Sequence, residues 1–90
     1  MNVIYKYQLP ILEKFTLDLP KDADILRVDV IEGKPYLWAL VTKDVPTTER
    51  NFEMYKTGQD IETYKNYLHY LGNLKLFVGQ ELCLYVFEVL

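Results

Sequence analysis

The chain has 90 residues, of which 50% are hydrophobic and 14% aromatic, and its formal net charge is −3. A chain of this length forms one domain, because two cores would each fall below the size at which folding alone is routine, and its apolar content is too high for a disordered segment. A protein that holds DNA or RNA by the phosphate backbone needs a surplus of Lys and Arg, so the acidic balance argues against general nucleic-acid binding.

The first two predicted elements are short strands with one buried face. Apolar and polar residues alternate over residues 5–9 and again over residues 15–19, and a period of two is typical of half-buried strands. Pro10 and Pro20 follow these runs. A proline at a strand end removes a backbone donor where pairing should stop.

The clearest predicted unit is a β-hairpin with arms at residues 25–31 and 36–41. Gly33 lies between the arms and can supply the positive φ that a tight turn requires. The second arm is apolar on both faces, which is typical of a strand in the middle of a sheet or barrel. We therefore expect Trp38 to belong to the core.

The second half of the chain is less regular. A polar loop at residues 42–49 precedes an alternating strand at residues 50–56. Residues 57–66 are the most polar stretch, where helical spacing competes with a loop, and clean alternation follows over residues 67–77. We expect a loop, with one helical turn left open, and then a strand. A turn and a last strand at residues 81–90 complete the chain.

Together these elements predict an all-β fold in a single domain over residues 1–90. About seven antiparallel strands would form a small sandwich or a partly closed barrel, with one short helix within residues 58–71 as the open alternative. Sheet edges must be paired or protected. A homodimer or higher homo-oligomer, formed through an edge or a tyrosine-rich face, is therefore one expectation.

Nothing in the sequence indicates export or a membrane. No basic segment followed by a long apolar stretch is visible at the start, and no run approaches the ~20 apolar residues of a membrane span. The single cysteine, Cys83, lies in an apolar run and is expected to be a small buried side chain in a chain that needs no oxidising compartment. We expect a cytoplasmic location.

The residues available for catalysis are few. The chain has one histidine, one cysteine and no serine, so a Ser-His-Asp triad is impossible and no zinc-ligand spacing exists. Its four glycines are scattered and form no phosphate-binding loop. We expect a protein that is not an enzyme and that has no cofactor, no catalytic residues and no metal site.

Binding is easier to support, because cations and tyrosines are interleaved between residues 50 and 75. Rings that stack and cations that hydrogen-bond suit a small anionic ligand such as a nucleotide, and the same residue types are enriched in protein interfaces. A solvated face with half-buried tyrosines is the alternative explanation. The candidate ligand- or partner-binding residues are Arg50, Tyr55, Lys56, Tyr64, Tyr67 and His69.

The hairpin motif Leu37-Trp38-Ala39-Leu40-Val41 resembles that of a family of small tailed-bacteriophage proteins of about this length. The Thr57-Gly58 pair and the closing Val86-Phe87-Glu88 also resemble the family's pattern. The chain departs from it by a longer polar segment at residues 62–66 and by Tyr85, where the family has a histidine. The resemblance implies a phage protein in the cytoplasm of an infected bacterium, and it brings neither an activity nor site residues.

Three functional hypotheses follow. The first is a non-enzymatic phage accessory protein that binds and inhibits a host protein of defence or nucleic-acid processing. The second is an oligomeric small-ligand or nucleotide-binding protein that sequesters a signalling molecule. The third is a minor virion or morphogenesis component. Small size, acidity and abundant tyrosine favour the first, and the cations and tyrosines of residues 50–75 favour the second.

Overall fold

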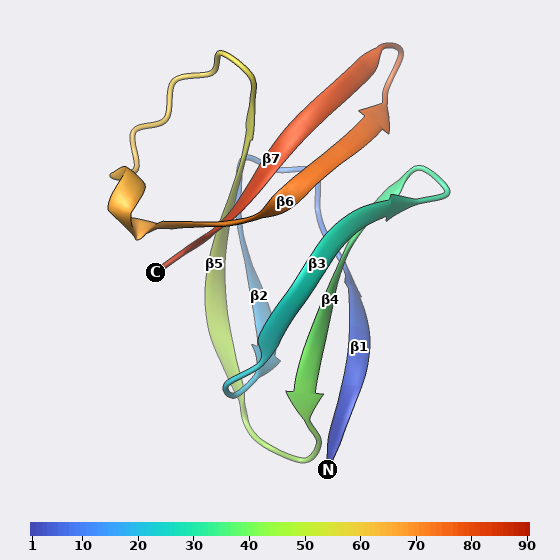
Figure 1. Ribbon diagram of the computed structural model, residues 1–90, viewed down its shortest axis with the longest axis vertical. Coiled ribbons are helices and arrows are strands. Elements are labelled where there is room, and N and C mark those ends of the chain that lie inside the picture. The colour runs from blue at the N-terminus through green and yellow to red at the C-terminus, as the bar shows by residue number, and fades with distance from the viewer.

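The computed structural model describes residues 1–90 as seven strands in two antiparallel sheets packed face to face (Figure 1). One sheet has the order β1-β4-β3 and the other the order β2-β5-β7-β6. The prediction of an all-β sandwich is therefore confirmed, and the strands do not close into a barrel. The strands are β1 (Asn2–Gln8), β2 (Lys14–Pro20), β3 (Asp24–Ile31), β4 (Lys34–Thr42), β5 (Thr47–Lys56), β6 (Leu68–Phe77) and β7 (Glu81–Val89).

The predicted hairpin is the β3–β4 unit. Ile31 pairs with Lys34, so its loop has only two residues, and both of these, Glu32 and Gly33, have positive φ values of 52° and 77°. This is the geometry of a type I′ turn, whose twist matches that of the flanking strands. Because β4 pairs with both β1 and β3, it is the central strand of its sheet, as predicted.

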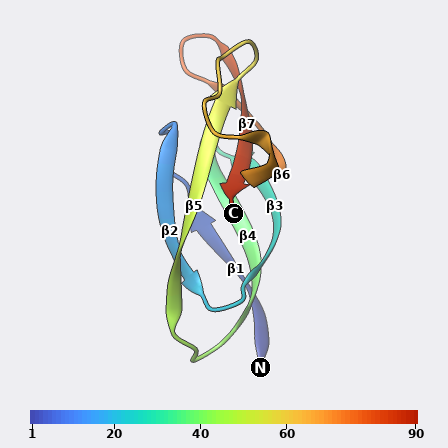
Figure 2. The same cartoon turned by 90° about the vertical axis from the view of Figure 1, so that its left-hand side faces the viewer.

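Only one face of β4 is buried, however. Leu37 and Ala39 are fully buried against the other sheet, whereas Trp38 on the opposite face is only half-buried. No further layer covers that side of the sheet, as the side view of the two layers shows (Figure 2). The expectation that Trp38 belongs to the core is therefore wrong, since an apolar second face does not by itself bring a second covering layer.

The core lies between the inner faces of the two sheets. Phe15 of β2 and Phe52 of β5 are directly paired in register and stack with ring centroids 5.4 Å apart. Leu19, Leu74 and Val86 are fully buried around them. Burial of such side chains contributes roughly 1.5–3 kcal/mol each, which makes this layer the main source of stability.

One flank of the sandwich is drawn together by β3 and β6, which lie side by side (Figure 1). Each of these strands has an irregularity, β3 at Leu26 and β6 at Leu71. The bulge at Leu71 interrupts the predicted alternation, because Tyr70 pairs with the outward-facing Phe87, whereas Gly72 pairs with the inward-facing Val86. Tyr70 therefore lies on the outer face of its sheet.

The polar stretch before β6 is a loop that ends in a single 3-10 turn, η1 (Lys65–Tyr67). This confirms the prediction of a loop followed by a strand, with the helical alternative reduced to one turn. The loop hydrogen-bonds through Thr63 to Glu53 on the outer face of β5. It therefore covers one part of that face and leaves the β6–β7 part open.

Candidate functional site

A row of aromatic side chains crosses the outer face of the four-stranded sheet. Tyr55 of β5 packs against Phe87 of β7, with ring centroids 6.5 Å apart, and Phe87 packs against Tyr70 of β6 at 5.5 Å. Tyr85 of β7 extends the row from Tyr70 at 6.5 Å. Exposure rises along it, from 3% at Tyr55 to 51% at Tyr70. We call Tyr70, Tyr85 and Phe87 the aromatic face.

Tyr55, the least exposed member of the row, is held by the buried carboxylate of Glu53. The hydroxyl of Tyr55 donates to Glu53 Oε1 at 2.5 Å, and Thr63 Oγ1 lies 2.8 and 2.9 Å from the two carboxylate oxygens. Burial, together with the hydrogen bond to Glu53, raises the pKa of Tyr55 to about 12. Tyr55 is therefore a neutral donor to Glu53, the carboxylate that holds the loop through Thr63, and its ring packs against Phe87 at the covered end of the row.

The same outer face has an acidic flank on β2 and β5. Asp18 lies directly opposite Glu49 in the antiparallel register, and both side chains are exposed. Neither belongs to either of the two ion pairs of the structure. Like charges directly opposite each other destabilise a sheet, so this acidic pair would gain from contact with a cation supplied from outside.

Arg50, a predicted binding residue, forms three hydrogen bonds within the fold. Its Nε and Nη2 donate to the two carboxylate oxygens of Glu88 at 2.5 and 2.7 Å, and Nη1 donates to the carbonyl of Ala23 at 2.5 Å. The hydrogen bond to Glu88 raises the pKa of Arg50 above its ordinary value. Arg50 thus ties β5 to β7 and to the segment that leads into β3.

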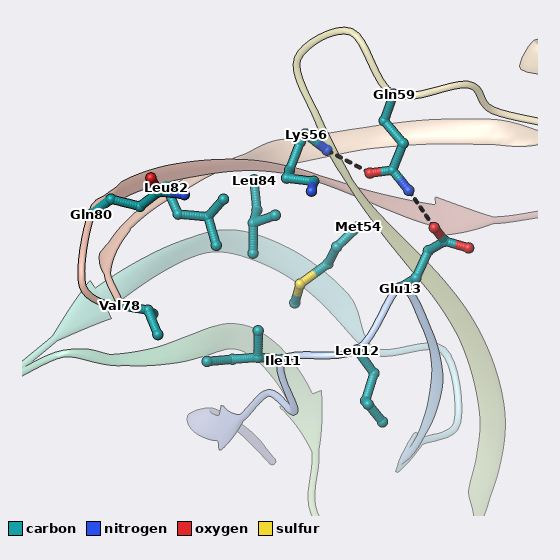
Figure 3. Close-up of a pocket in the computed structure, with 10 residues that line it drawn as sticks. All are labelled: Ile11, Leu12, Glu13, Met54, Lys56, Gln59, Val78, Gln80, Leu82 and Leu84. Atoms are coloured by element: carbon teal, nitrogen blue, oxygen red, sulfur yellow. Dashed lines mark hydrogen bonds between the residues drawn. The ribbon is translucent and has the colours of Figure 1, made fainter.

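The other predicted residues do not gather at one place. Tyr64 and Tyr67 contact each other edge-on at η1, with centroids 5.9 Å apart, and both are exposed. His69 is exposed and pairs in register with Glu88. Lys56 lies exposed beside a pocket at the end of the sandwich (Figure 3). The structure therefore brings together only Tyr64 and Tyr67, and places Arg50 and His69 on the two strands that flank Glu88.

Cations stack on aromatic rings elsewhere, on the outer face of the three-stranded sheet. The guanidinium of Arg27 lies 4.7 Å from the ring centroid of Trp38, and the ammonium of Lys6 lies 4.6 Å from that of Tyr36. Arg27 also pairs with Asp29. Each cation and its ring come from different strands, so their spacing in the sequence does not indicate the contact.

No group of three or more His, Cys, Asp or Glu side chains lies close enough to hold a metal ion. No helix in the structure has the length and apolar character that a membrane crossing requires. The described surfaces are therefore aromatic and charged surfaces without a clustered set of metal ligands.

Fold and surfaces together define a two-sheet β-sandwich domain with an exposed aromatic face on one sheet. The chain belongs to the family described as a domain of unknown function, DUF7352, whose model matches residues 1–90. Comparisons with curated proteins and with solved structures found no match.

Proposed function

We propose that this protein is a small, non-enzymatic bacteriophage accessory protein that binds and inhibits a host protein in the cytoplasm of the infected bacterium. The observation that carries the proposal is the aromatic face, which is continuous with the supported ring of Tyr55. Tyrosine and phenylalanine rings give large contact areas at a small entropic cost. Such rings, held on rigid strands, are typical anchors of protein interfaces.

The geometry of the sheet suits a partner of ordinary size. A standard interface buries about 800 Å² on each side, and the molecule measures 41 by 32 Å across its broad dimensions. Tyr70 and Tyr85, which are 51% and 36% exposed, provide the central anchors.

The acidic pair Asp18 and Glu49 indicates the chemistry of the partner. A basic surface would relieve the repulsion between these two carboxylates on contact. Enzymes that process nucleic acids carry basic grooves for phosphate backbones. A host enzyme of that kind would be inhibited if the sheet covered its groove, because substrate and inhibitor would then compete for one surface.

The test is affinity capture from a lysate of the host bacterium, followed by an activity assay on the purified partner. Tyr70→Ala/Tyr85→Ala removes the two anchors, and Tyr36→Ala on the other sheet is the matched control. We expect the wild type and the control to retain one host protein and the double variant to retain none. The activity of that host protein should fall when the wild type or the control is added, and should not change with the double variant. Background capture alone, or equal retention by the double variant, would refute the proposal.

A second candidate function rests on the stacked cations of the three-stranded sheet. An oligomeric protein that sequesters a nucleotide-sized anion would use Arg27 on Trp38 and Lys6 on Tyr36, since stacking and charge together suit such a ligand. Native mass spectrometry of protein from its host tests it. A homo-oligomer with added mass, lost in Arg27→Ala, supports this function, and an unliganded monomer opposes it.

A further inference from the structure

A pocket of about 450 Å³ opens at one end of the sandwich (Figure 3). None of its lining residues belongs to the aromatic face. Its floor is made by the buried core residues Met54 of β5 and Leu84 of β7, with Leu82 beside them. Ile11, from the segment between β1 and β2, faces them across the opening. A ligand here would touch the hydrophobic core itself, in a volume typical of small-molecule sites.

The rim of this pocket exposes apolar side chains to water. Ile11, Leu12 and Val78 line it and are 51%, 57% and 64% exposed. Ile11 and Leu12 lie between β1 and β2, and Val78 lies between β6 and β7, yet all three border one opening. An apolar group in the pocket would remove part of this surface from water, at roughly 25 cal/mol per Å².

One cation lies at the mouth of the pocket. Lys56 pairs in register with Leu84, so its side chain is on the inner face of the sheet, and it belongs to neither ion pair of the structure. The one carboxylate among the lining residues, that of Glu13, accepts a hydrogen bond from the amide of Gln59. Gln59 is itself held by the backbone N–H of Lys56 at 3.0 Å. The Lys56 ammonium therefore has no anionic partner of its own.

We infer that this pocket binds a linear aliphatic carboxylate, with its alkyl chain against Met54 and Leu84 and its carboxylate beside Lys56. Apolar walls select the chain, and the unpaired ammonium favours a negative head over a neutral one. The inference is independent of the host partner proposed above, because none of its residues belongs to the aromatic face.

The experiment is a titration of the isotopically labelled protein with sodium decanoate, followed by the methyl NMR signals of Ile11, Met54 and Leu84. We expect saturable shifts confined to the pocket. Lys56→Gln should weaken decanoate binding by roughly fivefold, the range of an exposed charge pair, and leave binding of the neutral decanol unchanged. Ile11→Asn should weaken both ligands.

The controls separate this site from nonspecific association and from the host interface. Lys14→Gln removes a cation from the outer face of β2 and should leave decanoate affinity unchanged, as should Tyr70→Ala. Shifts that fail to saturate below the concentration at which decanoate aggregates would overturn the inference. Equal decanoate affinity in Lys56→Gln would also overturn it, because it would leave an apolar cavity with no preference for an anionic head.

Discussion

Val28 of β3 lies directly over Gly72 of β6, on the flank where these two strands bring the two sheets into contact. A Cβ atom at residue 72 would stand 2.9 Å from Val28 Cγ2, a separation that real Cβ atoms almost never show, and the φ angle of Gly72 is +145°. Glycine is therefore required here on two counts, contact and backbone conformation. The absence of one side chain allows this flank of the sandwich to close.

Gly72→Ala should lower the free energy of unfolding by about 2 kcal/mol, through overpacking against Val28 and backbone strain. Gly58→Ala is the matched control: its φ is +83° but nothing lies within 4 Å of the added Cβ, so it should lose only the strain, about 1 kcal/mol. Urea denaturation measures both. If Val28→Ala fails to recover part of the loss in the Gly72→Ala background, the contact is not the cause.

The β3–β4 hairpin could be predicted from sequence because its determinants are local. Gly33 supplies a positive φ within a two-residue loop, and the flanking alternation sets which side of each arm faces the core. The order of strands along the chain follows for the same reason. How the remaining strands pair with distant neighbours is set by the packing of whole sheets, which no short window of sequence contains.

The candidate site was harder to predict, and two cases show why. The bulge at Leu71 adds one residue to β6 and so moves Tyr70 to the outer face, an outcome that strict alternation does not predict. The partner of Arg50 is Glu88, 38 residues away, so its local sequence suggests a free cation. Sequence neighbours therefore pointed to Arg50 as a ligand-binding residue, and tertiary pairing engages it within the fold.

The Arg50–Glu88 pair should contribute measurably to stability. Removing one partner of a buried ion pair costs about 3–5 kcal/mol. The cost should be somewhat smaller here, because 22% of the Arg50 side chain is exposed. We expect Arg50→Met to lose about 2 kcal/mol in thermal or urea unfolding, and Arg50→Met/Glu88→Met to recover part of it because no unpaired carboxylate remains. Arg27→Met, in an exposed pair, should lose no more than about 1 kcal/mol. Equal losses at Arg50 and Arg27 would contradict this account.

Tyr55 predicts how stability changes at alkaline pH. Its pKa is raised from 10.0 to about 12, first by burial and then by the hydrogen bond to Glu53, so the folded state holds this proton more tightly than the unfolded state. The stability that this contributes is complete below pH 10 and is lost as pH rises toward 12, by at most about 1.4 kcal/mol per pH unit. Tyr55→Phe should therefore lose less stability than the wild type between pH 10 and 11.5 in urea denaturation. The exposed Tyr64→Phe should match the wild type, and identical slopes for all three would argue against a raised pKa.

The acidic pair predicts opposite effects on stability and on binding. Asp18→Lys places a cation opposite Glu49, so it should raise the stability of the isolated protein by about 0.5 kcal/mol. The same change should weaken a partner that meets this face with a basic surface, and Asp18→Asn should lie between on both scales. Unfolding curves give the first effect, and competition with the wild type for the captured host protein gives the second. If a variant is more stable and binds equally well, the acidic flank lies outside the proposed interface. Only the rings of Tyr70 and Tyr85 would then remain as its anchors.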